Sequence, residues 1–232
     1  LFHPEMAEEI ACECPEWAAE SLKARFKRRF KKEMESLLEP APLDLRINPL
    51  KTTREEALAH LKELDLAVTE TPYSPYGLRV KNRPALGQIK MLKEGAIEIQ
   101  DEGSQLIAFL MEARAGERIV DFCAGAGGKT LALSAAMENR GRIIACDVLE
   151  KRLKRSGERF RRAGLHNIET RTLKSERDPW VKRHKQSFDR VLVDAPCSGT
   201  GTWRRNPDAR WKELGPGLSN LLPLQAGILE SA

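Results

Sequence analysis

RIVDFCAGAGGKTLALSAAMENRGRIIACD (118–147) is the stretch of sequence that decides the fold. It contains an apolar strand, a glycine-rich turn, a helix over 129–137 and a second apolar strand over 142–146. Two further candidate strands, at 167–173 and 188–194, follow after helical segments. Strands that alternate with helices in this way predict an α/β fold with a parallel, doubly wound sheet.

The glycine-rich turn is the first candidate for a binding site. In CAGAGGKT (123–130), the glycines remove the Cβ atoms that would block close approach of a ligand to the backbone. A phosphate-binding P-loop would need glycine in place of Cys123. A dinucleotide-binding turn would need its third glycine in place of Thr130. Both patterns fail, and a pocket for an adenosyl group remains.

An acidic residue follows at the place that such a pocket requires. Asp147 ends the second strand, where its carboxylate can accept hydrogen bonds from the hydroxyl groups of a ribose. The alternative is that Asp147 only caps the helix that begins after it. The turn and the acid together favour an adenosyl ligand, and loss of the carboxylate is expected to weaken its binding severely.

Size and composition are ordinary for a globular protein. The chain has 232 residues, 41% of them hydrophobic and 31% charged, and a formal net charge of +5. This basic excess is compatible with a polyanionic partner but does not by itself indicate one. No apolar run approaches the ~20 residues that span a bilayer. The acidic N-terminus lacks the pattern of a signal peptide, so we expect no membrane and a cytoplasmic location.

The five cysteines predict neither disulfide bonds nor a metal site. Cys12, Cys14, Cys123, Cys146 and Cys197 are odd in number and include no CxxC pair. The four histidines show no ligand spacing, and the first two cysteines are too close together to hold a metal without partners. Reduced thiols agree with a cytoplasmic location.

The first part of the chain has a different rhythm. Residues 16–39 predict one helix, whose basic face is either solvated or a surface for RNA phosphate. A strand over 43–48, a helix that Thr53 caps, and strands near 66–69 and 77–80 predict a small α+β unit. This unit is expected to end before residue 95, and a further helix is expected to begin near residue 104.

The most specific stretch is VLVDAPCSGTGTWRRNPDARW (191–211). Asp194 ends the fourth strand at the edge that also carries the glycine-rich turn, and ligands of such sheets bind beyond this edge. Cys197 follows in a loop. A cysteine is often a small core residue, but packing does not explain one between proline and serine, so a functional thiol is favoured. Trp203 and Trp211 either stack on RNA bases or fix the loop.

Five stretches, taken in order, resemble the Nop/Sun family of RNA cytosine-carbon-5 methyltransferases, and within it the bacterial ribosomal RNA enzymes. They are LDLRINPLKTTREEAL (43–58), IQDEGSQLIA (99–108), DFCAGAGGKT (121–130), ACDVLEKRL (145–153) and DAPCSGTGTWRRNPDARW (194–211). The resemblance implies S-adenosyl-L-methionine as cofactor and RNA, in particular ribosomal RNA, as partner.

The resemblance also implies a domain order. An N-terminal helical segment (1–42) precedes a small α+β, RNA-recognition-like domain (43–95) and a Rossmann-like methyltransferase domain (96–232). The sequence gives no indication of an oligomeric state.

Residue roles are also implied by the resemblance. The backbone of the turn is implied to surround the methionine end of the cofactor, through Cys123, Ala124, Gly125, Ala126, Gly127, Gly128, Lys129 and Thr130. Asp147 is implied to hold the ribose, with Arg152 close by, and Lys129 to help order the site. Asp194 is implied to lie between the cofactor and the target cytosine. The resemblance implies an Asp just after the third strand, where this sequence reads LKSERD (173–178). Ser175 or Glu176 could take its place, and the adenine contact is left unassigned.

The expected reaction needs a thiol. Carbon 5 of cytosine becomes nucleophilic when a thiolate adds to carbon 6, which is covalent catalysis. Chemistry alone nominates Cys197. The resemblance instead implies a nucleophile in a later Thr-Cys motif, with Cys197 assisting product release, and the sequence has no Thr-Cys dipeptide. The unpartnered strand 191–195 also suggests that C-terminal strands are missing, so we expect weak cofactor binding and no turnover.

Two other function classes are considered. A non-catalytic RNA- or cofactor-binding homologue would explain the missing nucleophile, but it would have little reason to keep both DFCAGAGGKT and DAPCSG. A methyltransferase for proteins or small molecules would share the Rossmann-like core. The N-terminal α+β unit and the Pro-Cys loop argue against it, because nitrogen methylation needs no thiol.

Overall fold

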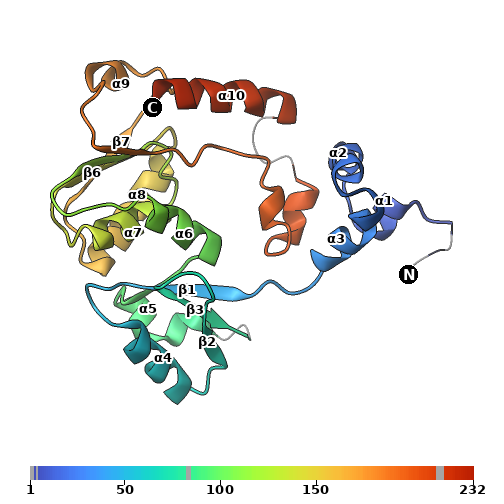
Figure 1. Ribbon diagram of the computed structural model, residues 1–232, viewed down its shortest axis with the longest axis horizontal. Coiled ribbons are helices and arrows are strands. Elements are labelled where there is room, and N and C mark those ends of the chain that lie inside the picture. The colour runs from blue at the N-terminus through green and yellow to red at the C-terminus, as the bar shows by residue number, and fades with distance from the viewer. Residues whose placement is uncertain (1–2, 4, 82–84, 213–216) are drawn as a thin grey trace. The chain divides into compact units, whose positions relative to one another are not determined.

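The computed structural model describes residues 3, 5–81, 85–212 and 217–232. Its residues cluster into two compact units (Figure 1). Unit 1 consists of Leu1–Ala41 and Cys197–Pro223, and unit 2 of Pro42–Pro196 and Leu224–Ala232. The stretch after Pro196 therefore clusters with the N-terminal segment, and not with the predicted methyltransferase domain, because Trp203 belongs to the core of unit 1.

Unit 2 begins with a small antiparallel sheet in the order β2-β3-β1-β4. Its elements are β1 (Leu43–Ile47), α4 (Arg54–Glu63), β2 (Val68–Glu70), β3 (Gly77–Val80), a 3-10 turn (Leu86–Gln88), α5 (Lys90–Lys93) and β4 (Ile97–Ile99). This βαββαβ arrangement is ferredoxin-like. The capping box that was predicted at the start of α4 is present, since Thr53 and Glu56 bond reciprocally. The sheet extends past the predicted limit at residue 95, because β4 pairs with β1.

The two faces of the small sheet differ in chemistry. Leu45 and Ile47 pack with α4 in one apolar cluster. Because side chains alternate along a strand, Asp44 and Arg46 face the other side, and both are buried. That polar face contacts α6, the glycine-rich turn and α8. None of the four strands carries an aromatic residue on which an RNA base could stack.

The second sheet of unit 2 is parallel, with the order β7-β6-β5-β8. Its strands are β5 (Arg118–Asp121), β6 (Arg142–Asp147), β7 (Ile168–Thr172) and β8 (Arg190–Leu192). The prediction of a parallel, doubly wound sheet is confirmed. The fourth strand is shorter than the predicted 188–194, because its pairing with β5 covers only three residues.

Helices cover both faces of this sheet (Figure 1). On one face α6 (Glu102–Leu110) and α7 (Gly128–Ala136) pack over Ile119 and Ile143, and α8 (Glu150–Ala163) packs beside α7. On the other face α9 (Pro179–Arg183) and the last part of α10 (Leu218–Ser231) pack over Val120 and Ile144. Helix α6 begins two residues before the predicted residue 104.

Unit 1 is helical and has its own core. It contains α1 (Glu8–Ala11), α2 (Glu16–Phe26), α3 (Phe30–Ser36) and 3-10 turns at Lys27–Arg29, Thr200–Thr202 and Pro207–Arg210. The prediction of one helix over 16–39 is wrong, because Lys27 adopts a left-handed conformation with φ of 49° and separates α2 from α3. Trp203 is buried against Phe30 and Met34 and therefore fixes its loop.

The buried guanidinium of Arg210 joins the two segments of unit 1. It donates to the backbone carbonyls of Glu13, at 3.2 Å, and Leu37, at 3.0 Å. In the part of the chain that the structure describes, no helix has the length and apolar character needed to cross a membrane.

Candidate functional site

The candidate site lies where the strands of the parallel sheet end. β5 pairs with β6 on one side and with β8 on the other, so the strand order reverses at β5. The glycine-rich turn follows β5, Asp147 ends β6, and Asp194 comes two residues after β8. Ligands of open α/β sheets bind in the crevice at such a reversal.

Two glycines of the turn have left-handed backbones, for different reasons. Gly127 has φ of +77°, and a Cβ there would lie 2.7 Å from the ring of Phe160 and 2.9 Å from Ser156. It is needed for the packing of the turn against α8. Gly125 has φ of +56°, and its nearest neighbour would be Arg152, 4.0 Å from the added atom. The side of the turn at Gly125 is therefore open to a ligand.

Asp147 joins the turn to the end of β6. Its Oδ2 accepts the N–H of Gly125 at 2.8 Å, and its Oδ1 accepts the N–H of Leu149 at 2.7 Å. The second contact shapes the start of α8, as the alternative interpretation of Asp147 requires, but the first one fixes the turn. A carboxylate has about four acceptor positions, so both oxygens can still accept hydroxyl groups of a ribose.

The side chains of Lys129 and Asp194 meet across the edge of the sheet. Lys129 stands in the first turn of α7, and its Nζ lies 2.6 Å from Oδ2 of Asp194. Lys129 is largely covered, whereas about half of the Asp194 side chain is exposed. The ion pair therefore leaves one side of the Asp194 carboxylate open to a ligand.

A buried acid that was not singled out from the sequence lies beneath the turn. Asp121 ends β5, and its Oδ2 accepts the Thr130 hydroxyl at 2.7 Å, while Oδ1 has no partner among the described residues. Burial raises the pKa of Asp121 to about 6, although the Thr130 bond and nearby Lys129 oppose the shift. An acid that ends an apolar strand is the sequence signal that could have indicated it.

The cysteines divide into covered and exposed thiols. Cys12, Cys14 and Cys146 are buried, Cys123 is half-buried and Cys197 is exposed. Burial, helped by nearby carboxylates, raises the pKa of Cys123 to about 12, so its thiol stays protonated at neutral pH. Cys197 belongs to unit 1, whereas the turn, Asp147 and Asp194 belong to unit 2.

The remaining predicted residues lie in the turn. Ala124 donates its N–H to the carbonyl of Cys146, at 2.8 Å. Ala126 is exposed at the tip, and Gly128 begins α7. Arg46 and Arg159 were not predicted, yet each contacts a carbonyl of the turn. Among the described residues, no group of three His, Cys, Asp or Glu side chains could hold a metal ion.

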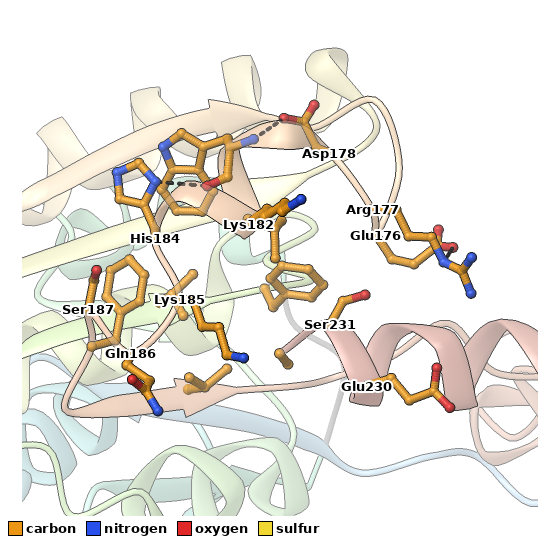
Figure 2. Close-up of a pocket in the computed structure, with 17 residues that line it drawn as sticks. Glu176, Arg177, Asp178, Lys182, His184, Lys185, Gln186, Ser187, Glu230 and Ser231 are labelled. Atoms are coloured by element: carbon orange, nitrogen blue, oxygen red, sulfur yellow. Dashed lines mark hydrogen bonds and ion pairs between the residues drawn. The ribbon is translucent and has the colours of Figure 1, made fainter.

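A separate cavity of about 600 Å³ lies beside α9 and the end of α10 (Figure 2). Val120 and Val191 of the sheet line it, together with a rim that includes Lys182, His184 and Glu230. None of the predicted cofactor or catalytic residues lines this cavity. The candidate site is therefore assigned from the turn and its acids, and not from the cavity.

Family models match most of the chain. Residues 108–232 match the model described as 16S rRNA methyltransferase RsmB/F. Residues 14–86 match the model described as the Methyltr_RsmF/B-like, ferredoxin-like domain, in agreement with the βαββαβ order of the small sheet.

Individual relatives agree with the family models. The chain is 37% identical over 225 residues to "Probable ribosomal RNA small subunit methyltransferase B" of Synechocystis sp., which covers 94% of this chain and 49% of that protein. The crystal structure of PH0851 is 28% identical, with a TM-score of 0.89, and covers 100% of this chain and 53% of that one. The crystal structure of NSun6 from Pyrococcus horikoshii with SFG is 20% identical, with a TM-score of 0.82, and shows the same fold. The match covers 94% of this chain and 79% of that one. The chain spans about half the length of the curated relatives it matches.

Proposed function

Because the chain belongs to the RsmB/F family of 16S rRNA methyltransferases, we propose that it methylates carbon 5 of cytosine in ribosomal RNA. S-adenosylmethionine is the cofactor of this family and supplies an electrophilic methyl group. The observation that carries the proposal is the pairing of a glycine-rich turn and Asp147 with the Lys129–Asp194 ion pair at one edge of the sheet. We also propose a cytoplasmic location.

The residues of the turn fit the cofactor. Gly125 leaves open space beside the backbone, and the carboxylate of Asp147 lies next to it. We propose that the backbone from Cys123 to Thr130 surrounds the methionine end of the cofactor and that Asp147 accepts the ribose hydroxyls. Arg152 approaches the open side of Gly125 and could contact the same ligand.

The Lys129–Asp194 pair is proposed to face the target base. The exposed side of the Asp194 carboxylate can accept a hydrogen bond from the exocyclic amine of cytosine, while Lys129 fixes its orientation. A base that is reached in this way must be unstacked or single-stranded.

Cys197 is the exposed one of the five cysteines. Chemistry alone makes it the nucleophile, whereas the family resemblance makes it the residue that assists product release. As the nucleophile, its thiolate would add to carbon 6 of cytosine, and the electron pair displaced toward carbon 5 would form the new bond to the methyl group. The bond from that methyl group to sulfur would break at the same time, with S-adenosylhomocysteine as the leaving group. A base then removes the proton from carbon 5, the double bond reforms, and the thiolate leaves. If another thiol of the whole protein is the nucleophile, Cys197 would act in this last step.

The test is methyl transfer from labelled S-adenosylmethionine to ribosomal RNA by the 232-residue chain, followed by nucleoside analysis. Label in 5-methylcytosine that is lost in Cys197→Ser supports the proposal with Cys197 as the nucleophile. Label in any other nucleoside overturns it. Cofactor binding without transfer supports the alternative function, a chain that binds RNA and cofactor but does not turn over.

A further inference from the structure

Two arginines, the buried Arg46 and the partly exposed Arg159, bond to backbone carbonyls of the glycine-rich turn. Arg46 of β1 donates from Nη1 to the backbone carbonyl of Gly128 at 2.8 Å and to Oε1 of Gln100 at 2.6 Å. Arg159 of α8 donates from Nη1 to the carbonyl of Ala126 at 2.6 Å. Two carbonyls of the turn are thus each bonded to a guanidinium group.

Both arginines are held by residues of the small sheet. Glu98 of β4 accepts Nη2 of Arg159 at 3.0 Å and also pairs with Arg162. Arg46 and Gln100 stand on β1 and just after β4. The glycine-rich turn therefore rests on residues of a sheet that precedes it in the chain and that carries none of the predicted cofactor residues.

Packing alone does not explain the burial of Arg46. Burial lowers the pKa of Arg46 to about 10, and the Arg159 cation adds to the shift while Glu98 opposes it. The bonded partners of Arg46 are two neutral oxygens, the side-chain oxygen of Gln100 and the carbonyl of Gly128. The carboxylate of Glu98 pairs instead with Arg159 and Arg162. A buried cation without a bonded carboxylate is costly, and an apolar side chain would fill the same space at lower cost.

The bond to the Gly128 carbonyl also orients the next peptide N–H. In a trans peptide the C=O and the following N–H point in opposite directions, so the bond from Arg46 sets the direction of the Lys129 N–H. This N–H belongs to the first turn of α7, whose free N–H groups are available to a ligand. The Lys129 side chain extends from the same peptide to Asp194.

We propose that Arg46 is a positioning residue for the cofactor, through which the ferredoxin-like sheet keeps the glycine-rich turn in its binding conformation. The inference rests on the proposed function for the identity of the ligand. The conformation of the turn can be measured without any ligand, so the two can fail separately.

The first measurement is amide hydrogen exchange of the chain without cofactor. The N–H of Gly127 is bonded to Ala124 and that of Leu131 to Gly127, so a peptide over 122–132 reports on the turn. In Arg46→Met we expect its exchange to rise by about tenfold or more. The matched control is Arg79→Met, because Arg79 stands on the same face of the same sheet but pairs with Asp44 and Glu102.

The second measurement is the affinity for S-adenosylhomocysteine by calorimetry. We expect a loss of about tenfold or more in Arg46→Met, a smaller loss in Arg46→Lys, which keeps a cationic donor group, and no loss in Arg79→Met. Unchanged exchange in Arg46→Met, or an equal rise in both methionine variants, would overturn the inference. If the unaltered chain does not bind S-adenosylhomocysteine, the proposed function fails, and the exchange measurement still decides the role of Arg46.

Discussion

Replacement of Asp147 by alanine tests the centre of the proposed site. The carboxylate accepts two backbone N–H groups, those of Gly125 and Leu149, and it is 7% exposed. A hydrogen bond to a charged group is worth about 1.5–3 kcal/mol. Because the edge of the sheet is open, water can replace part of this loss, and we expect unfolding to become easier by about 2–4 kcal/mol.

The loss of affinity should be of similar size. Asp147→Ala removes the acceptor for the ribose hydroxyls and also releases the Gly125 N–H that orders the turn. A loss of about 2–4 kcal/mol corresponds to a dissociation constant that is about 30- to 1000-fold higher. Calorimetric titration with S-adenosylhomocysteine measures this change, and urea unfolding measures the change in stability.

Asp189→Ala is the matched control. Asp189 also accepts a backbone N–H, that of Arg118 at 2.7 Å, but at the opposite end of β5. It should lower stability without changing the affinity. If Asp147→Ala bound S-adenosylhomocysteine within about threefold of the unaltered chain, or if both variants lost affinity equally, Asp147 would not be a cofactor residue.

Three further predictions concern the turn, the buried acid and unit 1. Gly127→Ala should lower the free energy of unfolding by more than about 2 kcal/mol, because the added Cβ would lie too close to Phe160. Gly125→Ala should lower it by about 1 kcal/mol, and urea unfolding measures both changes. The raised pKa of Asp121 stabilises the fold below pH 3.8, and this contribution is lost as the pH rises through about 6. Relative to Asp121→Asn, the unaltered chain should therefore lose about 2–3 kcal/mol between about pH 4 and pH 7; a constant difference would contradict the assignment. Trp203→Ala should cost about 3–5 kcal/mol and exposed Trp211→Ala little, by thermal unfolding.

Local patterns in the sequence were sufficient to predict the parallel sheet and the position of the turn. The apolar strands, the glycines and the acid at the end of β6 are all local features, and a strand and its following turn leave a clear periodicity. The ion pair between Lys129 and Asp194 also agrees with the rule that strand ends meet at one edge.

Long-range contacts could not be predicted in this way. The bond from Arg46 to Gly128 joins residues 82 positions apart, and nothing near Arg46 in the sequence indicates its partner. The break at Lys27 was missed because the helical periodicity continues through it, while the left-handed backbone depends on how α2 and α3 pack. The pairing of the N-terminal segment with the stretch after Pro196 has no local signal at all.

Unit 1 has a consequence for how the protein is made. Its core joins Leu1–Ala41 with a segment that begins at Cys197, so it cannot close until the second segment has left the ribosome. At about 5–20 residues per second, this delay is roughly ten to thirty seconds. Phe30 and Met34 lack their contact with Trp203 throughout that interval, whereas β1 to β4 are synthesised early in it and can already pair. The core of unit 1 therefore closes later than contacts made within either segment alone.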